Sequence, residues 1–146
     1  MKNLKNMNKL TPFHLAVPVD NISVCRKFYR EVLGCVEGRS SKHWVDFNLF
    51  GHQLVIHYKE KSSKEVHTNP VDGKNVPVPH FGVVLEWDTF HEFSKTLTKK
   101  GVEFIIEPYI RFQGQTGEQA TMFFTDPSGN ALEFKSFKNF DQIFAK

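Results

Sequence analysis

The sequence predicts an α+β fold built from two copies of one module, each a strand, a helix and about three further strands. Two stretches carry this prediction, residues 12–34 (PFHLAVPVDNISVCRKFYREVLG) and residues 79–101 (PHFGVVLEWDTFHEFSKTLTKKG). Each opens with proline and continues as a short alternating strand, an acidic residue, an amphipathic helix and a glycine. Two copies are too few for a repeat array, so the pattern indicates an internal duplication within one domain.

The two helices are predicted from the spacing of their apolar residues. In the first copy, apolar residues recur at intervals of three and four across residues 22–33, after Asp20 and before Gly34. In the second copy, the helical run follows Asp88 and stops at Gly101. Aspartate is a favoured residue at a helix start and glycine at a helix end, so we expect both helices to be capped this way.

Strand-like runs follow each helix. They are residues 43–50 (HWVDFNLF), 52–58 (HQLVIHY), 102–112 (VEFIIEPYIRF), 119–124 (QATMFF) and 131–137 (ALEFKSF). The last run leaves a predicted turn at residues 126–129 (DPSG), and residues 113–119 (QGQTGEQ) are predicted to form a flexible hairpin loop. Each half of the chain therefore contains the strands needed for one module.

Composition and turn residues set the boundaries. We expect a loose segment at 1–10, a single domain at 11–137 and a tail at 138–146. Within the domain we expect a first module at about 11–58, a linker at 59–77 and a second module at about 78–137. The segment between the modules is polar and rich in turn residues. It is either a solvated linker or a lid or binding loop, because connections this long are uncommon in compact domains.

The composition argues against several classes of protein. A net charge of +3 with scattered Lys and Arg gives no reason to expect nucleic acid, and the apolar runs are too short to span a membrane. Residues 1–10 lack the apolar segment of a signal peptide, and Cys25 and Cys35 are poorly placed for a disulfide framework. We therefore expect a cytoplasmic protein with reduced thiols. Fifteen Phe residues suit an aromatic interior or pocket.

Two histidines occupy the same position in the two copies. His14 and His80 each begin the opening strand of a module, and each shares a strand face with a small residue, Ala16 or Gly82. The bulky residues of both strands lie on the other face, which can pack on the helices. When the last strands are aligned on each other, Glu133 falls on the same side as the histidines.

Glu133 alone would be interpreted as a carboxylate that faces water, as on many half-exposed strands. Together with His14 and His80 it predicts a metal site, because two imidazoles and one carboxylate form the facial triad that binds Fe(II). Such a site leaves positions open for substrate and oxygen. The same ligand types bind Mn(II) or Zn(II), so the ligands alone do not choose the metal. We expect their atoms to converge on one ion.

Four stretches of this sequence resemble the vicinal oxygen chelate (VOC) superfamily: FHLAVPV, RKFYREVLG, PHFGVVL and DPSGNALEF. This superfamily includes glyoxalase I, extradiol dioxygenases, methylmalonyl-CoA epimerase and the fosfomycin- and bleomycin-resistance proteins. The resemblance covers residues 11–137. It implies tandem βαβββ modules that form a curled mixed sheet around a metal-binding cleft, with the helices outside. It also implies that the metal ligands are His14, His80 and Glu133.

One departure from the superfamily pattern bears on the reaction. Glyoxalase I-like enzymes have a fourth ligand, Glu, where this chain has Val55, and the epimerases have Gln there. Valine neither binds a metal nor accepts a proton, so the resemblance favours an extradiol-type dioxygenase that acts on a small molecule with vicinal oxygens. A fosfomycin-resistance-like transferase has a similar three-ligand site. A register shift of two residues would bring Gln53 or His57 to the position of Val55, which keeps a glyoxalase- or epimerase-like lyase or isomerase open. A metal-free protein of the bleomycin-resistance type ranks third.

Further residues are candidates for the reaction. His57 would be the acid/base, although it also suits a surface strand position. Gln53 and Tyr109 would bind substrate, and Arg111, which shares a strand face with Tyr109, would bind a substrate carboxylate or remain solvated. The cofactor is expected to be one divalent ion, Fe(II) first, then Mn(II), Zn(II) or Ni(II). A homodimer is the expected assembly, and the cleft closes either within one chain or between two.

Overall fold

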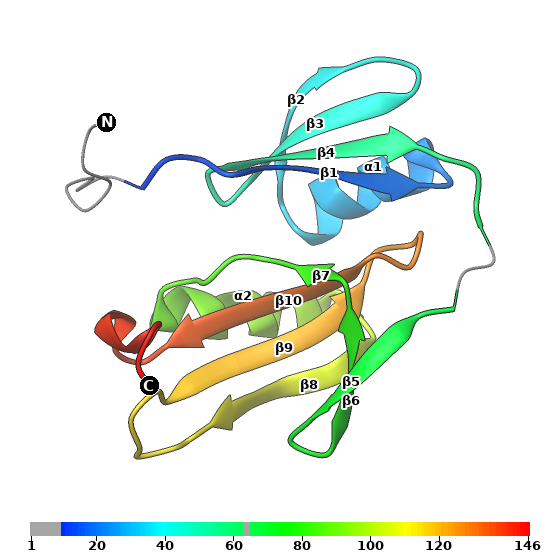
Figure 1. Ribbon diagram of the computed structural model, residues 1–146. Helices are drawn as coiled ribbons and strands as arrows, with labels where there is room; N and C mark the ends of the chain where they lie inside the picture. The colour runs from blue at the N-terminus through cyan, green and yellow to red at the C-terminus, as the bar shows by residue number, and fades with distance from the viewer. Residues whose placement is uncertain (1–9, 63–64) are drawn as a thin grey trace, which may run out of the picture.

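The computed structural model describes residues 10–62 and 65–146 (Figure 1). Its elements are, in chain order, β1 (His14–Val19), α1 (Ile22–Lys27), the π-helical continuation η2 (Phe28–Val32), β2 (Val36–Ser40), β3 (Trp44–Leu49), β4 (His52–Tyr58), β5 (His67–Val71), β6 (Lys74–Val78), β7 (His80–Phe81), α2 (Trp87–Lys99), β8 (Phe104–Arg111), β9 (Gln119–Thr125), β10 (Ala131–Phe137) and the 3₁₀ turn η3 (Phe140–Gln142). The predicted strands at 43–50, 52–58, 102–112, 119–124 and 131–137 are all present.

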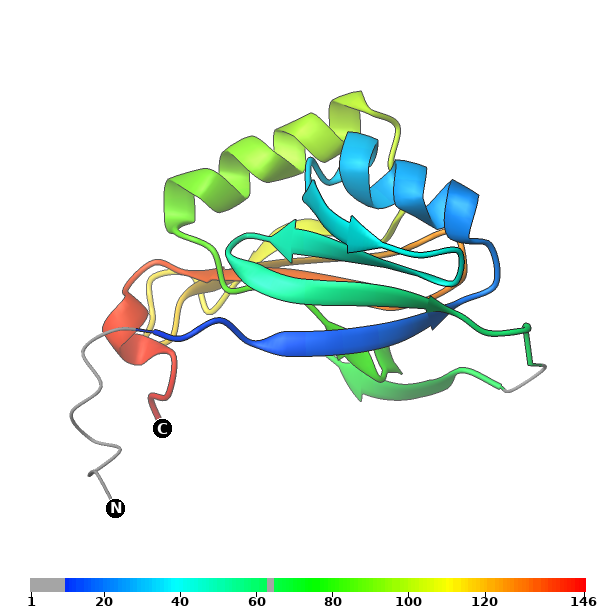
Figure 2. The same cartoon turned by 90° about the horizontal axis from the view of Figure 1, so that it is seen from above.

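Each module forms a four-stranded mixed sheet with the same strand order. The sheets run β1-β4-β3-β2 and β7-β10-β9-β8, and in each the first pair is parallel while the others are antiparallel. Figure 2 shows both helices on one side of the sheets. We call the faces turned away from α1 and α2 the open faces. The tandem βαβββ fold is therefore confirmed.

The structure confirms the alignment of the two copies. His14 pairs with Gln53 across β1 and β4, and His80 pairs with Ala131 across β7 and β10. Val55 lies two residues after Gln53 in the first module, and Glu133 lies two residues after Ala131 in the second. These two positions are equivalent, as the sequence alignment predicted.

The predicted helix starts are wrong by one or two residues. The residue that caps α1 is Asn21, whose Oδ1 accepts from the backbone N–H of Val24 at 3.1 Å. Asp20 instead accepts from the Ser128 hydroxyl at 2.6 Å, so its carboxylate joins the first module to the turn of the second. The second helix starts at Trp87, which places Asp88 in its first turn.

The turn at residues 126–129 also joins the modules. Asp126 Oδ1 accepts from the backbone N–H groups of Ser128 and Asn130, both at 2.9 Å, which fixes the turn. Its Oδ2 accepts from the buried Tyr29 hydroxyl at 2.8 Å. The Asn130 amide in turn donates to the Pro18 carbonyl at 2.8 Å. This network, which is buried at the Tyr29–Asp126 hydrogen bond, links the two modules.

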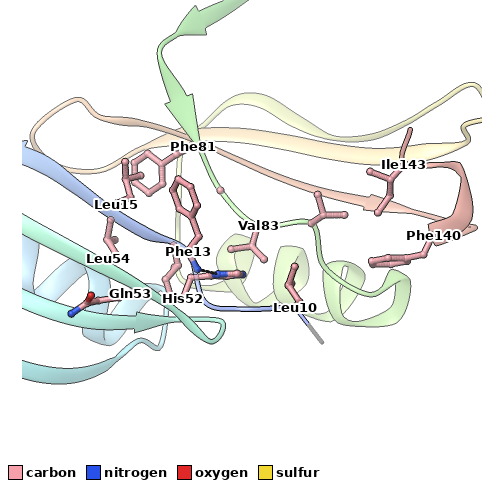
Figure 3. A pocket seen from close by; sticks show the side chains of 13 residues that line it. Leu10, Phe13, Leu15, His52, Gln53, Leu54, Phe81, Val83, Phe140 and Ile143 are labelled. Atoms are coloured by element: carbon pink, nitrogen blue, oxygen red, sulfur yellow. Dashed lines mark hydrogen bonds between the residues drawn. The ribbon is translucent and has the colours of Figure 1, made fainter. Parts of the chain in front are cut away.

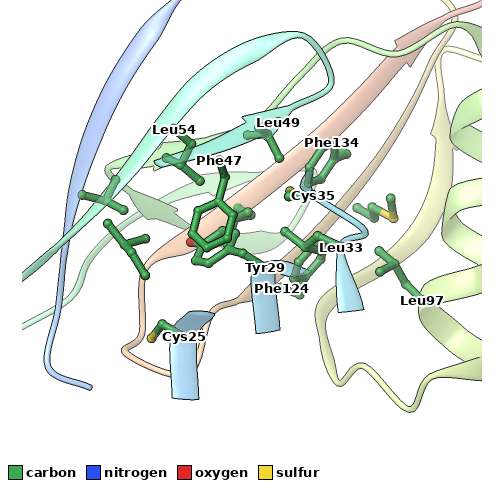
Figure 4. Packing of buried hydrophobic residues seen from close by; sticks show 14 of the residues in the cluster. Cys25, Tyr29, Leu33, Cys35, Phe47, Leu49, Leu54, Leu97, Phe124 and Phe134 are labelled. Atoms are coloured by element: carbon green, nitrogen blue, oxygen red, sulfur yellow. The ribbon is translucent and has the colours of Figure 1, made fainter. Parts of the chain in front are cut away.

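One hydrophobic core runs through both modules (Figure 4). Phe124 and Phe134 stack in parallel at 5.9 Å between ring centroids, and Phe28 of the first module lies 6.4 Å from Phe124. Much of the high Phe content is thus used in the interior. Cys25 and Cys35 are buried free thiols, and burial raises the pKa of Cys35 to about 12. Among the residues that the structure describes, no helix is both long and apolar enough to cross a membrane.

The segment between the modules contains a hairpin that the sequence prediction missed. Strands β5 and β6 pair antiparallel around Asp72 and Gly73, which both have positive φ. Val76 of this hairpin is buried against Ile106 and Phe123 on the open face of the second sheet. Residues 67–78 of the predicted linker region therefore form a hairpin, while residues 63–64 lie outside the described residues.

Candidate metal centre

His80 and Glu133 form a close pair on the open face of the second sheet. Their strands, β7 and β10, are adjacent, and Gly82 lets the backbones approach, because a Cβ there would overlap the carbonyl oxygen of Glu133. The Nε2 of His80 lies 2.9 Å from the Oε2 of Glu133. The fold thus brings two of the three predicted ligands into contact.

Neighbouring groups fix the orientation of both side chains. The Nδ1 of His80 lies 2.6 Å from the Pro77 carbonyl oxygen, which only accepts hydrogen bonds, so Nδ1 carries the hydrogen. The Thr121 hydroxyl donates to Glu133 Oε1 at 2.7 Å, and Lys135 Nζ lies 3.7 Å from the same oxygen. Such second contacts are usual for metal-binding histidines and carboxylates. They leave Nε2 of His80 and Oε2 of Glu133 facing each other.

This geometry fits a metal ion. In a neutral ring that donates through Nδ1, Nε2 carries a lone pair, and a carboxylate oxygen offers only lone pairs. Two such atoms in contact need a cation, either a proton or a metal ion. Ligands at neighbouring octahedral positions with bonds of about 2.1 Å are about 3.0 Å apart. The observed separation of 2.9 Å between His80 and Glu133 matches that spacing.

His14 belongs to a second polar cluster, on the open face of the first sheet. Its Nδ1 lies 2.9 Å from Gln53 Oε1. The Gln53 amide donates to Asp46 Oδ2 at 3.5 Å, and Arg39 Nε lies 3.8 Å from that oxygen. Asp46 is buried, and it pairs across β3 and β4 with Val55. The first module therefore has a carboxylate next to the position where Glu133 stands in the second.

The three predicted ligands do not converge within one chain. Across residues 10–62 and 65–146, no three side chains of His, Cys, Asp or Glu are grouped closely enough to hold one metal ion. The physical reason is that His14 and His80 are held by strand pairs of different sheets. The expectation of convergence is not met in a single copy. The assignment of His14, His80 and Glu133 as ligands stays a prediction.

The other candidates fall on both sheets. Tyr109 pairs with Thr121, which pairs with Lys135, so Tyr109 and Arg111 lie on the same face as Glu133. Both contact Asp72 at the tip of the hairpin, a partner that the sequence did not predict.

His57 is exposed on β4, four residues beyond Gln53, which is about 13 Å along a strand. Its role as acid/base stays a prediction, and the carboxylate that is connected to His14, through Gln53, is that of Asp46.

Sequence reasoning missed Asp46, Thr121 and Asp72. A charged residue within the apolar run HWVDFNLF was the available signal for Asp46, and an Asp-Gly pair between two short runs was the signal for the hairpin. Thr121 had no signal, because threonine is ordinary in a strand.

An apolar groove lies between the two modules (Figure 3). Its volume is about 310 Å³, and Phe13, just before β1, and Leu15, within β1, face Phe81 and Val83 of the second module across it. Phe13 is 66% exposed. Gln53 borders the groove, although Figure 3 shows its side chain directed away from Phe81 and Val83.

Comparisons with known proteins agree with this fold. A family model described as the Glyoxalase/Bleomycin resistance protein/Dioxygenase superfamily matches residues 11–134. A crystal structure of a glyoxalase/bleomycin resistance protein/dioxygenase from Alicyclobacillus acidocaldarius is 30% identical, with 97% of this chain and 100% of that chain covered and a TM-score of 0.77. Comparison with functionally curated proteins gives no match.

Two more distant structures share the fold alone. Lactoylglutathione lyase from Agrobacterium tumefaciens is 16% identical, with 90% and 95% of the two chains covered and a TM-score of 0.60. A genomically encoded fosfomycin resistance protein from Listeria monocytogenes is 18% identical, with 93% and 98% covered and a TM-score of 0.61. Their different names illustrate that this fold supports several kinds of chemistry.

Proposed function

Because the chain belongs to the glyoxalase/bleomycin resistance protein/dioxygenase superfamily, we propose that it is a metal-dependent enzyme whose ion is bound by His14, His80 and Glu133. The observation that carries the proposal is the contact between His80 Nε2 and Glu133 Oε2 at 2.9 Å. Pro77 and Thr121 fix both groups so that their lone pairs face each other. A cation bound between these two groups, which in this proposal is a metal ion, would satisfy both lone pairs.

We further propose that two copies complete each site, one supplying His80 and Glu133 and the other supplying His14. Both clusters lie on open faces, which are turned to the same side of the chain, away from the helices (Figure 2). The exposed Phe13 and the apolar groove beside it are surfaces that association would cover. A homodimer of this kind has two equivalent sites by symmetry.

The reaction that we propose is extradiol-type dioxygenation of a small molecule with vicinal oxygens. A divalent ion, Fe(II) first and otherwise Mn(II), Zn(II) or Ni(II), supplies Lewis-acid binding of two oxygens, and iron adds redox chemistry with O₂. Val55 adds no fourth protein ligand, which leaves room for substrate. Gln53 binds a substrate oxygen through its amide, and Tyr109 and Arg111 donate hydrogen bonds to an anionic group.

The reaction class is tested by metal analysis of protein purified without chelator, then anaerobic Fe(II) loading and an oxygen-electrode screen of catecholic compounds. We expect oxygen uptake that depends on Fe(II) and on the catechol. Turnover with Zn(II), Mn(II) or Ni(II) and no oxygen uptake would instead indicate a lyase, isomerase or transferase. Protein that neither retains nor binds any of these ions would be a metal-free binding protein.

The shared site is tested by mixing two inactive variants, His14→Ala and Glu133→Ala. If two copies form each site, a mixed dimer has one site with both defects and one with none. Random re-association then restores about a quarter of the wild-type metal sites and activity. If each site lies within one chain, every site in the mixture keeps one defect and nothing is restored. That result would refute the shared site.

A further inference from the structure

We propose that Arg111 and Tyr109 form a binding site for the carboxylate group of the substrate, and that Asp72 occupies this site until substrate displaces it. This inference extends the proposed function by naming a substrate class, an organic carboxylate. It also assigns a role to the β5–β6 hairpin, whose tip carries Asp72. The binding step itself requires no metal.

Asp72 makes the contacts that a bound carboxylate would make. Its Oδ2 accepts from Arg111 Nε at 2.5 Å, and its Oδ1 accepts from Arg111 Nη2 at 3.3 Å. The Tyr109 hydroxyl donates to Oδ2 at 2.9 Å. A two-point contact of this kind is how arginine recognises carboxylates. The hydrogen bond from Arg111, and to a smaller extent the one from Tyr109, lowers the pKa of Asp72 below its usual value, so the carboxylate is ionised at neutral pH.

The two sides of this contact differ in how firmly they are held. The Arg111 side chain is 19% exposed on β8, within a four-stranded sheet, whereas the Asp72 side chain is 40% exposed at a hairpin tip. Within the described part of the chain, strands β5 and β6 pair only with each other. Two-stranded hairpins are marginally stable alone, so the hairpin tip is the part that can move.

The hairpin is fastened close to its tip, which confines the movement to Asp72 itself. Val76 is buried against Ile106 and Phe123, Val71 packs against the same cluster, and the Pro77 carbonyl accepts a hydrogen bond from His80. When Asp72 leaves, the donors of Arg111 and Tyr109 become available on the face that carries Glu133. An anion held there would lie on the same sheet face as Glu133, and the rest of its body would extend along that face.

A cavity next to Arg111 has room for that body. Its volume is about 340 Å³, and Arg111, Gln119, Lys135 and Phe137 help to line it. Gln119 is only 7% exposed, and its Oε1 has no hydrogen-bond partner among the described residues. Buried polar atoms are normally paired, so this oxygen suits a hydroxyl donor on a ligand. A hydroxylated carboxylate would satisfy both Arg111 and Gln119.

The test is a titration of metal-free protein with benzoate, and a second titration with benzamide, its uncharged counterpart. Binding is monitored through the NMR signal of the Arg111 Nε–H group. The variant is Asp72→Asn, which keeps a residue that adopts positive φ, since Asn-Gly is a favoured hairpin turn. We expect benzoate to bind the variant about five- to tenfold more tightly than wild type, because the competing carboxylate is gone. Benzamide should bind neither protein.

The matched control is Glu37→Gln, which also removes a carboxylate bonded by the Nε and Nη2 of an arginine, Arg26, but on the first module. It should leave benzoate affinity unchanged, and Arg111→Lys should weaken it at least tenfold. Unchanged or weaker benzoate binding in Asp72→Asn, or equal binding of benzamide, would overturn the proposal. The metal-free titration can succeed while metal binding fails, so the two proposals fail independently.

Discussion

The two modules share one backbone register but present different side chains at equivalent positions. In the first module, His14 lies beside Gln53, and the next residue of β4 on the same open face is Val55. In the second, the equivalent of Val55 is Glu133, and it contacts His80. Duplication has therefore preserved the strand geometry while the chemistry of the copies diverged. The second module has two adjacent candidate ligands, and the first contributes a single imidazole next to an amide.

The modules also differ in what covers their open faces. On the second sheet the β5–β6 hairpin buries Val76 against Phe123, and its Pro77 carbonyl holds His80. His80 itself nevertheless stays exposed, as His14 and His57 do on the first sheet. The open face of the second sheet, partly covered by the hairpin, resembles a binding site, and the open face of the first sheet resembles a surface that contacts another protein surface. In the proposal above, that is the second module of another copy.

The largest effect is expected where the two modules differ most, at Glu133 and Val55. Glu133→Ala should lower the affinity for Mn(II) or Zn(II) by about 100-fold or more, since loss of an outer contact alone costs about 10- to 100-fold. Val55→Ala, at the equivalent position, should leave the affinity within about twofold, because valine is no ligand. Competition with a chromophoric chelator measures both. Equal affinity in the two variants would remove the distinction between the modules.

That distinction was partly predictable from sequence. Because both the opening strands and the last strands of the two copies align without gaps, the face of each strand and the equivalence of Val55 and Glu133 followed from a period of two. The distance between the modules did not follow. Strand patterns state which way a side chain points within its sheet, but not how two sheets sit together, so His14 was expected near Glu133 and lies in a separate cluster.

The hairpin was missed for a local reason. Pro70 lies within β5 and Pro77 within β6, and proline argues against a strand in sequence reasoning. The Asp-Gly turn signal between them was therefore read as part of a linker. The contact of Asp72 with Arg111 depends on where the folded hairpin lies on the second sheet, so no local sequence pattern predicts it. Helix caps failed similarly, since Asp20 bonds Ser128 from the other module.

A second pair of equivalent positions, Gly82 and Ala16, is expected to give the next largest effect. Each lies two residues after the histidine of its module, but only Gly82 would overlap Glu133 if it carried a Cβ. Gly82→Ala should therefore push β7 away from β10 and lower the free energy of unfolding by about 1–3 kcal/mol. It should also weaken metal binding, because His80 moves away from Glu133.

The matched control is the reverse change, Ala16→Gly. It should cost about 0.5–1 kcal/mol through backbone entropy alone and leave metal binding unchanged. Urea unfolding measures the stability of both variants, and the chelator competition measures their metal affinity. If Gly82→Ala were as mild as Ala16→Gly, the close approach of β7 and β10 would not be needed for the His80–Glu133 contact.

The smallest expected effect concerns whether the modules unfold separately. Both cysteines lie in the first module, and each module has one tryptophan, Trp44 or Trp87. The shared core and the Tyr29–Asp126 hydrogen bond predict that the two modules unfold in a single transition. In a Trp44→Phe variant at pH 7.5, thiol labelling reports on the first module and Trp87 fluorescence on the second. Both should give the same urea midpoint. Earlier labelling of the thiols would mean that the first module opens alone.

The pH dependence sharpens that experiment. Burial raises the pKa of Cys35 from an ordinary 9.0 to about 12, so the folded state binds its proton more tightly than the unfolded state. The stabilisation from this proton is complete below pH 9, and it is lost as the pH rises from 9 towards 12. Raising the pH from 7.5 to 10 should therefore lower the urea midpoint, and a Cys35→Ala variant should show less of this decrease. If the modules unfold as one, the midpoint from Trp87 fluorescence must shift by the same amount as the midpoint from the thiols, although Trp87 lies in the module without cysteine.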